Sequence, residues 1–182
     1  MKELKEDEFS ELYEEEKKAG EEKIGGEDFV TECLVDSDLE LLFPNEYIPS
    51  SSERMLLYRE LDGLEEDKEL FEFRSRLEDR FGKLPPESEE LLRIAPLRRL
   101  AKRLGAEKLV LKSGCMTLYF VSNPDSIFYE SKAFGKVITY MGMNPRRCNL
   151  REKNGKRSMI VQHVGNVETA VSILQEIVGL EG

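Results

Sequence analysis

The sequence contains few of the residues that most enzymes use for chemistry. Its 182 residues include one histidine, His163, no tryptophan and three cysteines. Cys33, Cys115 and Cys148 are widely spaced and form no CxxC pair, so neither a zinc site nor a redox motif is expected. Three separated cysteines fit reduced thiols in a cytosolic protein better than they fit a secreted disulfide framework.

Phosphate-binding motifs and long apolar runs are also missing from the sequence. No GxGxxG follows an expected strand and no GxxxxGK[ST] occurs, which excludes the common ways of cradling the phosphates of ATP. No stretch approaches the roughly 20 apolar residues of a membrane span, and the charged segment from Lys2 to Lys18 is unlike a signal peptide. We therefore expect a soluble cytoplasmic protein that binds no metal, no cofactor and no membrane.

A catalytic role for His163 is the one enzymatic hypothesis that the sequence leaves open. A hydrolytic triad needs a nucleophile, a base and an orienting acid. The strand expected over residues 158–164 places His163 on one face with Met159 and Val161, which favours a half-buried structural histidine. Carboxylate pairs such as Glu78-Asp79 are frequent in the first half of the chain and are typical of a solvated helix face.

Charge is distributed unevenly along the chain. Residues 1–90 carry a net charge of −18 and residues 91–182 carry +8, which together give the −10 of the whole chain. The overall sign argues against nucleic-acid binding by the whole surface, but the basic half can face an acidic partner or nucleic acid. Cations are densest between residues 146 and 157, and we identify four of them as candidate phosphate contacts: Arg146, Arg147, Lys156 and Arg157.

Helical periodicity dominates residues 45–104, which we expect to form a helical lobe. A charged connecting extension over residues 1–28 and an extended stretch over residues 29–43 precede it. Ser50 and Glu53 have the spacing of a capping box at a helix start. Apolar residues then recur at helical spacing in three successive segments, and a glycine, the usual residue after a helix end, follows each: Gly63, Gly82 and Gly105.

From residue 107 the periodicity changes to that of short strands, which predicts an α+β lobe over residues 107–182. Ser113-Gly114 and Asn154-Gly155 each separate two β-prone runs, as hairpin turns do. A short helix around Ile127, a strand over Val137–Met141 and a final helix capped by Asn166 complete the expected order ββαβββα. Because it contains several hairpins, the sheet should be mainly antiparallel, flanked by two helices.

One stretch of the helical lobe resembles a known family. Residues Leu77 to Pro85 read Leu-Glu-Asp-Arg-Phe-Gly-Lys-Leu-Pro, which matches the LxDRFGxLP marker of the C-terminal (TRCF) domain of bacterial transcription-repair coupling factors. Tyr47-Ile48-Pro49, Glu53-Arg54 and Leu57-Tyr58 are similar to that domain as well, and the likeness covers about residues 29–120. Physically, such a marker forms a corner between helices, with a glycine in a conformation that other residues avoid.

The resemblance implies that residues 29–182 are a non-catalytic C-terminal regulatory domain within a longer bacterial protein. Members of the family are ATP-dependent DNA translocases that use ATP and Mg²⁺ in a motor outside this segment. They displace RNA polymerase stalled at DNA damage and recruit UvrA in transcription-coupled nucleotide-excision repair. The C-terminal domain docks on the UvrB-like module of the same chain, hides the UvrA-binding surface and restrains the motor.

Two binding surfaces are candidates for the function of this chain. The first is the acidic helix that carries Glu72, Glu78, Asp79 and Arg80, which we expect to dock on a basic counterpart of the UvrB-like module. A clamp of this kind would couple closed and open states by about 1–3 kcal/mol. The alternative is a nucleic-acid contact through the basic hairpin over residues 146–157, which predicts steep salt dependence.

Overall fold

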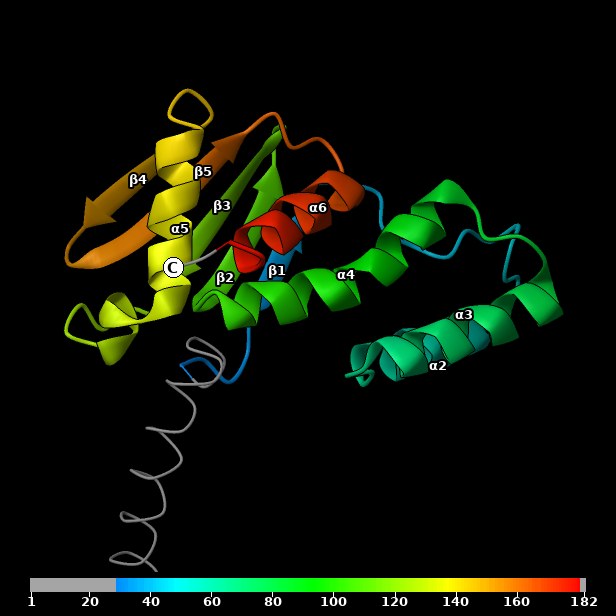
Figure 1. Cartoon of the computed structure of the whole chain (residues 1–182). Helices are drawn as coiled ribbons and strands as arrows, with labels where there is room; N and C mark the ends of the chain where they lie inside the picture. Colours follow the sequence, from blue (N-terminus) through cyan, green and yellow to red (C-terminus); the bar gives the residue numbers. More distant parts are fainter. Residues whose placement is uncertain (1–28, 181–182) are drawn as a thin grey trace, which may run out of the picture.

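The computed structural model describes residues 29–180 (Figure 1), so the connecting extension expected over residues 1–28 lies outside the described residues. The described elements follow one another in this order: β1 Leu34–Ser37, α2 Ser51–Asp62, α3 Asp67–Phe81, α4 Pro86–Arg103, β2 Ala106–Lys112, β3 Cys115–Phe120, the 3₁₀ helix η1 Ile127–Glu130, α5 Lys132–Met143, β4 Cys148–Lys153, β5 Lys156–Gln162 and α6 Val167–Val178. In residues 29–180 no helix is long and apolar enough to cross a membrane.

The five strands form one mixed sheet in the order β1-β2-β3-β5-β4. β1 runs parallel to β2, and the other three pairs of neighbours are antiparallel. Helices α4, α5 and α6 lie against one face of this sheet (Figure 1). The predicted α+β class and the mainly antiparallel sheet are therefore confirmed.

Both expected hairpin turns are present, and each has two residues with positive φ. Ser113 and Gly114 have φ values of 55° and 73°, and Asn154 and Gly155 have 55° and 79°. Such type I′ turns match the right-handed twist of the strands that they join. They set the register in which Lys112 faces Cys115 and Lys153 faces Lys156, and thereby decide which side chains share a face of the sheet.

The strand predicted over Val137–Met141 is wrong, because these residues belong to helix α5. The hydroxyl of Ser131 caps the helix by accepting a hydrogen bond from the amide of Phe134. Three residues at helical spacing then bury one face: Ala133, Val137 and Tyr140. Packing of this face outweighs the β propensity of Val137-Ile138-Thr139. The order after residue 107 is therefore two strands, η1 and α5, two strands and α6.

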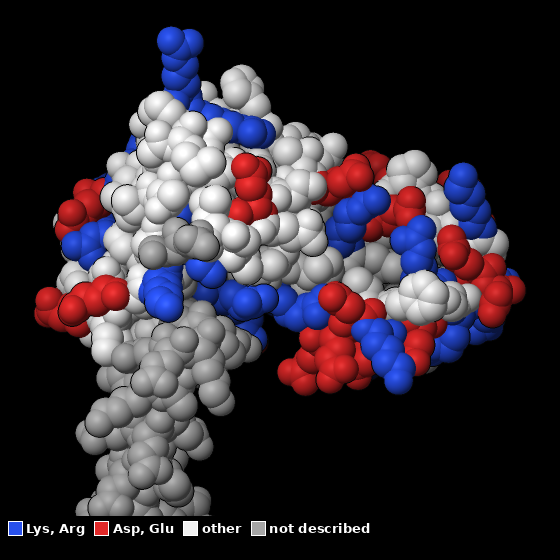
Figure 2. Space-filling model, in the orientation of Figure 1, with Lys and Arg blue, Asp and Glu red and all other residues white. Residues whose placement is uncertain are grey.

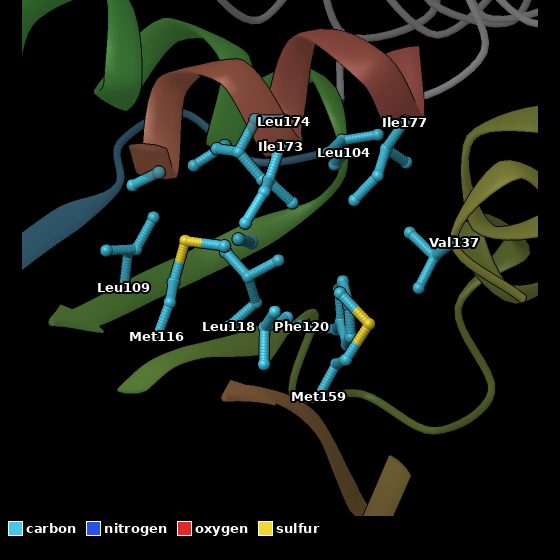
Figure 3. Packing of buried hydrophobic residues seen from close by; sticks show 14 of the residues in the cluster. Leu104, Leu109, Met116, Leu118, Phe120, Val137, Met159, Ile173, Leu174 and Ile177 are labelled. Atoms are coloured by element: carbon cyan, nitrogen blue, oxygen red, sulfur yellow. The ribbon is translucent and has the colours of Figure 1, made fainter. Parts of the chain in front are cut away.

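The main core fills the space between the sheet and the three helices that cover it (Figure 3). Alternate residues of the strands point into it, and α6 supplies the opposite wall. Its contributors from β2, β3 and β5 are Leu109, Leu111, Met116, Leu118, Phe120, Met159 and Val161, and those from α6 include Ile173, Leu174 and Ile177. The clean helical spacing of the apolar residues in α6 explains why that helix was predicted correctly.

The helical lobe has a small core of its own, separate from the main core. It consists of seven buried residues that come from the segment before α2, from α2, α3 and α4, and from the α3–α4 connection: Phe43, Ile48, Leu61, Phe73, Leu77, Leu84 and Leu92. Helix α4 contributes to both cores, because Leu92 packs in the small core while Leu97 and Ala101 pack in the main core. The helix continues through Pro96 without a break, and so joins the two parts of the molecule.

Candidate docking surface

Helix α3 presents three different surfaces. Phe73 and Leu77 are buried in the small core. On one flank of this buried face, Arg76 forms an ion pair with Glu60 of α2. Glu72 and Asp79 are seven residues apart, so they lie on the same side of the helix, and both are exposed. The side opposite the small core is open to solvent and carries these two carboxylates together with the exposed Lys68, which lies one turn before Glu72.

The family marker forms the corner that ends α3 and orients this helix. Gly82 has a φ of 93°, and its amide donates to the carbonyl of Glu78 over 3.0 Å. The hydroxyl of Tyr47 donates to the carbonyl of Gly82 over 2.6 Å, and its ring lies 5.7 Å from the ring of Phe81. Pro85 then caps α4. The residues from Leu77 to Pro85 therefore build the corner between α3 and α4.

Two further residues of the family resemblance, Arg54 and Tyr58 of α2, bind the segment that precedes this helix. The guanidinium of Arg54 donates to the carbonyls of Ile48 and Pro49 over 2.5 and 3.2 Å. The amide of Phe43 donates to the hydroxyl of Tyr58 over 2.9 Å, beneath stacked rings. These contacts fix the chain before α2 against the helix pair.

The structure divides the four predicted docking residues instead of placing them on one surface. Arg80 forms an ion pair with Glu53 of α2, and its guanidinium carbon lies 4.9 Å from the centre of the Phe81 ring. Glu78 lies on the other flank, where its carboxylate is 3.8 Å from Arg74. Among the described residues, no hydrogen bond or ion pair involves the side chain of Glu72 or of Asp79. Only Glu72 and Asp79 are thus available on the outward side.

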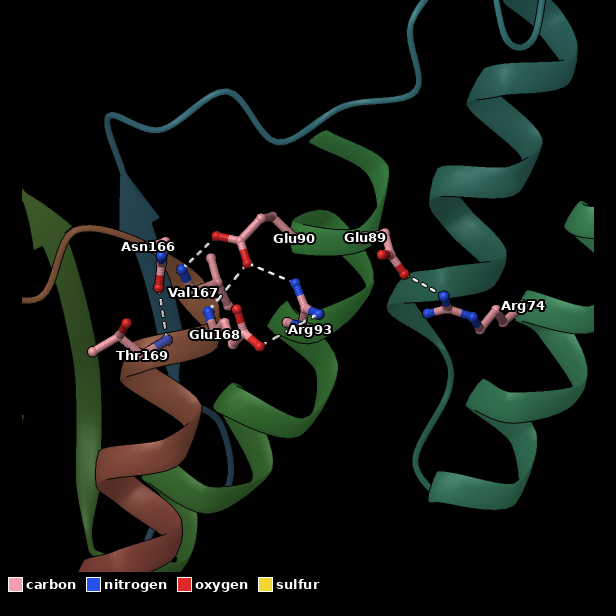
Figure 4. A network of polar contacts seen from close by, with 8 residues as sticks. All are labelled: Arg74, Glu89, Glu90, Arg93, Asn166, Val167, Glu168 and Thr169. Atoms are coloured by element: carbon pink, nitrogen blue, oxygen red, sulfur yellow. Dashed lines mark hydrogen bonds and ion pairs between the residues drawn. The ribbon is translucent and has the colours of Figure 1, made fainter. Parts of the chain in front are cut away.

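Sequence reasoning missed two groups of residues around α3. Arg74 joins Glu89 of α4 (Figure 4), and the pairs Arg76–Glu60 and Arg80–Glu53 hold α3 to α2. The four-residue and seven-residue spacings of these charges in consecutive helices were the available signal. Phe71 was missed as well, and 69% of it is exposed beside the outward side of α3. Figure 2 shows cations and carboxylates interspersed over the helical lobe.

The basic hairpin contributes fewer open cations than its sequence suggests. The guanidinium of Arg147 donates to the carbonyls of Gln162 and His163 over 2.9 and 3.0 Å. Arg157 lies 4.3 Å from the centre of the Tyr129 ring. Arg146 and Lys156 are exposed. Two of the four predicted phosphate contacts therefore have structural roles, and two remain open to a partner.

A polar network joins the start of α6 to α4 (Figure 4). The carboxylate of Glu90 accepts hydrogen bonds from the amides of Val167 and Glu168 over 2.6 and 3.1 Å. Arg93 donates to the same carboxylate over 2.9 Å, and Asn166 caps α6 as predicted. A carboxylate at a helix N-terminus satisfies amides that have no partner within the helix. Glu90 therefore anchors α6 on the helix that both cores share.

A groove of about 680 Å³ lies between the start of β1, the α2–α3 connection and α4. Arg98 and Arg99 line it from α4, and they form ion pairs with Asp62 at the end of α2 and Asp67 at the start of α3. The charges on its two walls therefore neutralise each other. This groove is a seam between the helical lobe and the rest of the chain, where the walls already bind each other.

The residues considered for chemistry are not brought together. His163 is exposed just after β5, with a φ of 63°, so the half-buried position predicted for it is wrong. The left-handed turn that redirects the chain from β5 toward α6 takes its side chain off the sheet. Within residues 29–180, no group of three or more His, Cys, Asp or Glu side chains could hold a metal ion.

The three thiols should differ in reactivity. Burial raises the pKa of Cys33 to about 11 and also raises the pKa of Cys148. With a pKa of about 11, only about one Cys33 side chain in a thousand is in the reactive thiolate form at pH 8. Ellman's reagent is therefore expected to react with Cys115, which is partly exposed, well before the other two. Rapid modification of all three thiols in the folded protein would contradict this burial pattern.

Comparison with known proteins finds one family repeatedly. The family model described as TRCF domain matches residues 37–131. The chain is 40% identical over 68 residues to the transcription-repair-coupling factor of Escherichia coli K12, which covers 37% of this chain and 6% of that protein. It is 31% identical over 106 residues to the corresponding protein of Rickettsia bellii, covering 58% of this chain and 9% of that protein. The chain thus spans less than a tenth of either relative.

A solved structure, the C-terminal domain of a transcription-repair coupling factor, has a similar fold. It superposes with a TM-score of 0.62 and 15% sequence identity, and covers 85% of this chain and 96% of that chain. The likeness therefore extends beyond residues 37–131 to most of the chain.

Proposed function

Because the chain belongs to the TRCF domain family, we propose that it is the regulatory, non-catalytic C-terminal domain of a transcription-repair coupling factor and acts by docking on the UvrB-like module of the longer protein. Docking would hide the UvrA-binding surface and restrain the ATP-driven motor until the protein engages stalled RNA polymerase. DNA, UvrA and RNA polymerase are then partners of the longer protein, while this chain binds its neighbouring module.

The observation that supports docking is the outward side of α3. It carries the carboxylates of Glu72 and Asp79 and the ammonium of Lys68. The ring of Phe71, of which 69% is exposed, borders this side on the flank that it shares with Glu78. An exposed aromatic ring beside polar residues is a common anchor of a protein interface. The ion pairs of Arg76 and Arg80 with α2 keep the helix rigid, so little conformational entropy is lost when a partner binds.

The carboxylates of Glu72 and Asp79 require a partner surface that carries positive charge. Exposed ion pairs contribute about 0.2–1 kcal/mol each, so two carboxylates alone make a weak contact. Adding an aromatic anchor whose loss costs about 2 kcal/mol gives a total of about 2.4–4 kcal/mol, which overlaps the coupling of about 1–3 kcal/mol that an allosteric clamp uses. The proposed counterpart is therefore a basic surface of the UvrB-like module with an apolar pocket.

Binding to the separately expressed UvrB-like module, measured by titration calorimetry, tests the proposal. Phe71→Ala and the double variant Glu72→Lys, Asp79→Lys are each expected to weaken binding at least tenfold. A double variant with the same charge change on the α+β lobe, Glu130→Lys, Glu176→Lys, is expected to bind like the unchanged chain. Absence of heat up to the solubility limit would refute a two-body clamp. An equal loss of affinity in both double variants would mean that docking does not use the outward side of α3.

A further inference from the structure

The sheet has a second face that is not covered by α4, α5 and α6. The register fixes which side chains lie on it, because every second residue of each strand points away from the main core. Across β2, β3, β5 and β4, one row is Lys108, Tyr119, Ser158 and Arg151, and the next is Val110, Thr117, Ile160 and Asn149. None of these side chains is buried. We call this surface the open face.

Cations outnumber carboxylates on the open face. Among the strand residues it carries Lys108, Lys112, Arg151, Lys153 and Lys156, against the single carboxylate of Asp36. Asp36 lies 3.1 Å from Lys112, and this neighbour holds the pKa of Asp36 below its usual value. The pair neutralises itself at the β1 edge. The other four cations keep a positive field over β2 to β4, although the whole chain carries −10.

An exposed aromatic ring lies among these cations. Tyr119 is in the middle strand β3, and 44% of it is exposed. Lys108 is directly opposite on β2, and Arg151 lies in the same row two strands away on the other side. With strands about 4.8 Å apart, the α-carbons of Lys108 and Arg151 are about 14 Å apart, with Tyr119 between them.

We propose that the open face binds single-stranded nucleic acid, with a base stacked on Tyr119 and backbone phosphates on Lys108 at one side and on Arg151, Lys153 and Lys156 at the other. A flat sheet that combines an aromatic ring with flanking cations is suited to unpaired bases, which expose a ring face and a flexible backbone. In a duplex the bases are paired and stacked on one another, so their ring faces are not free to stack on Tyr119. Such binding is tolerant of sequence, because every base can stack.

This site overlaps the basic hairpin over residues 146–157, which contains Arg151, Lys153 and Lys156, but it uses only the side chains on the open face and adds Lys108 and Tyr119. Arg147 and Arg157, two of the four residues identified there, contact the protein itself. Of the four candidate phosphate contacts identified from the sequence, only Lys156 is among the cations of the open face. The proposal also does not depend on docking through α3, which lies outside the sheet.

Fluorescence anisotropy of the whole chain with a labelled oligothymidylate tests the proposal through its salt dependence. Four phosphate contacts to a single strand predict a slope of about −2.8 in log–log form, or a loss of affinity of about 50-fold between 50 and 200 mM salt. Neutralising two cations with Arg151→Ala, Lys153→Ala is expected to reduce that loss to about sevenfold. Arg59→Ala, Lys68→Ala removes two exposed cations of the helical lobe and is expected to leave the slope unchanged.

Variants of Tyr119 separate stacking from charge. Tyr119→Ala is expected to weaken binding roughly five- to 150-fold, because stacking on one ring contributes about 1–3 kcal/mol. Tyr119→Phe keeps the ring and is expected to stay within about twofold of the unchanged chain. No binding at 50 mM salt, or equal binding by Tyr119→Ala, would overturn the proposal. Tighter binding of a polyglutamate peptide than of the oligothymidylate at the same salt concentration would overturn it in favour of an acidic protein partner.

Discussion

Replacing Gly105 with alanine is expected to lower the free energy of unfolding by about 2–5 kcal/mol. Gly105 connects α4 to β2 with a φ of 78°, and an added Cβ would lie 2.2 Å from the ring of Phe128. That ring is fully buried and packs against Phe29, Phe120 and Phe134, so it cannot move aside. The change thus combines a conformation that L-residues avoid with overpacking of the main core.

Urea unfolding with two other glycines as controls measures the two contributions. Gly114 has a φ of 73° but no atom within 4 Å of an added Cβ, so Gly114→Ala should cost only the conformational part, about 1–2 kcal/mol. Gly142 lies in α5 at an open position with ordinary φ, so Gly142→Ala should stabilise the protein by about 0.5–1 kcal/mol. If Gly105→Ala lowers the free energy of unfolding no more than Gly114→Ala does, the clash with the Phe128 ring does not destabilise the protein.

Replacing Phe73 with alanine is expected to cost about 3–5 kcal/mol and to unfold the helical lobe before the sheet. Phe73 is fully buried at the centre of the small core, which is formed by only seven buried residues. A core of that size has few other contacts that could compensate for the cavity. The main core contains a different set of residues, so the sheet should keep most of its stability.

Amide hydrogen exchange of the Phe73→Ala variant shows which part of the molecule unfolds first. Amides of α2 and α3 are expected to lose protection, while those of β2 and β3 keep it. Phe71→Ala, two positions away and mostly exposed, should change stability by less than about 0.5 kcal/mol although it is expected to weaken docking. A uniform loss of protection across helices and sheet would mean that the two cores unfold as one cooperative unit.

Local chemistry explains which parts of the fold could be predicted from the sequence. Ser113-Gly114 and Asn154-Gly155 carry the backbone preference of a two-residue turn, so both hairpins were correct. The capping residues Ser50 and Asn166 were also correct, because each side chain accepts from an amide three residues later. These signals act within a few residues and are independent of the rest of the chain.

The parts that depend on distant contacts could not be predicted. The run Val137-Ile138-Thr139 favours a strand, but one side of it packs in the main core as a helix. β1 lies within the extended stretch expected over residues 29–43, but its parallel pairing with β2 could not be predicted, because that pairing joins segments far apart in the sequence. The acidic residues of α3 looked equivalent, yet Glu78 has Arg74 beside it while Glu72 and Asp79 face outward. Rotation about the helix axis, which tertiary packing sets, decides that difference.

The parallel pairing of β1 with β2 has a consequence for the order in which the chain assembles. The whole helical lobe lies between these two neighbouring strands, in residues 38–105, whereas the hairpins close over two residues. By loop-closure entropy the longer connection costs about 3 kcal/mol more to close. The hairpins and the helix pair should therefore form first, and β1 should join the sheet last. The same strand should be the first to detach when the chain is pulled from its N-terminal side.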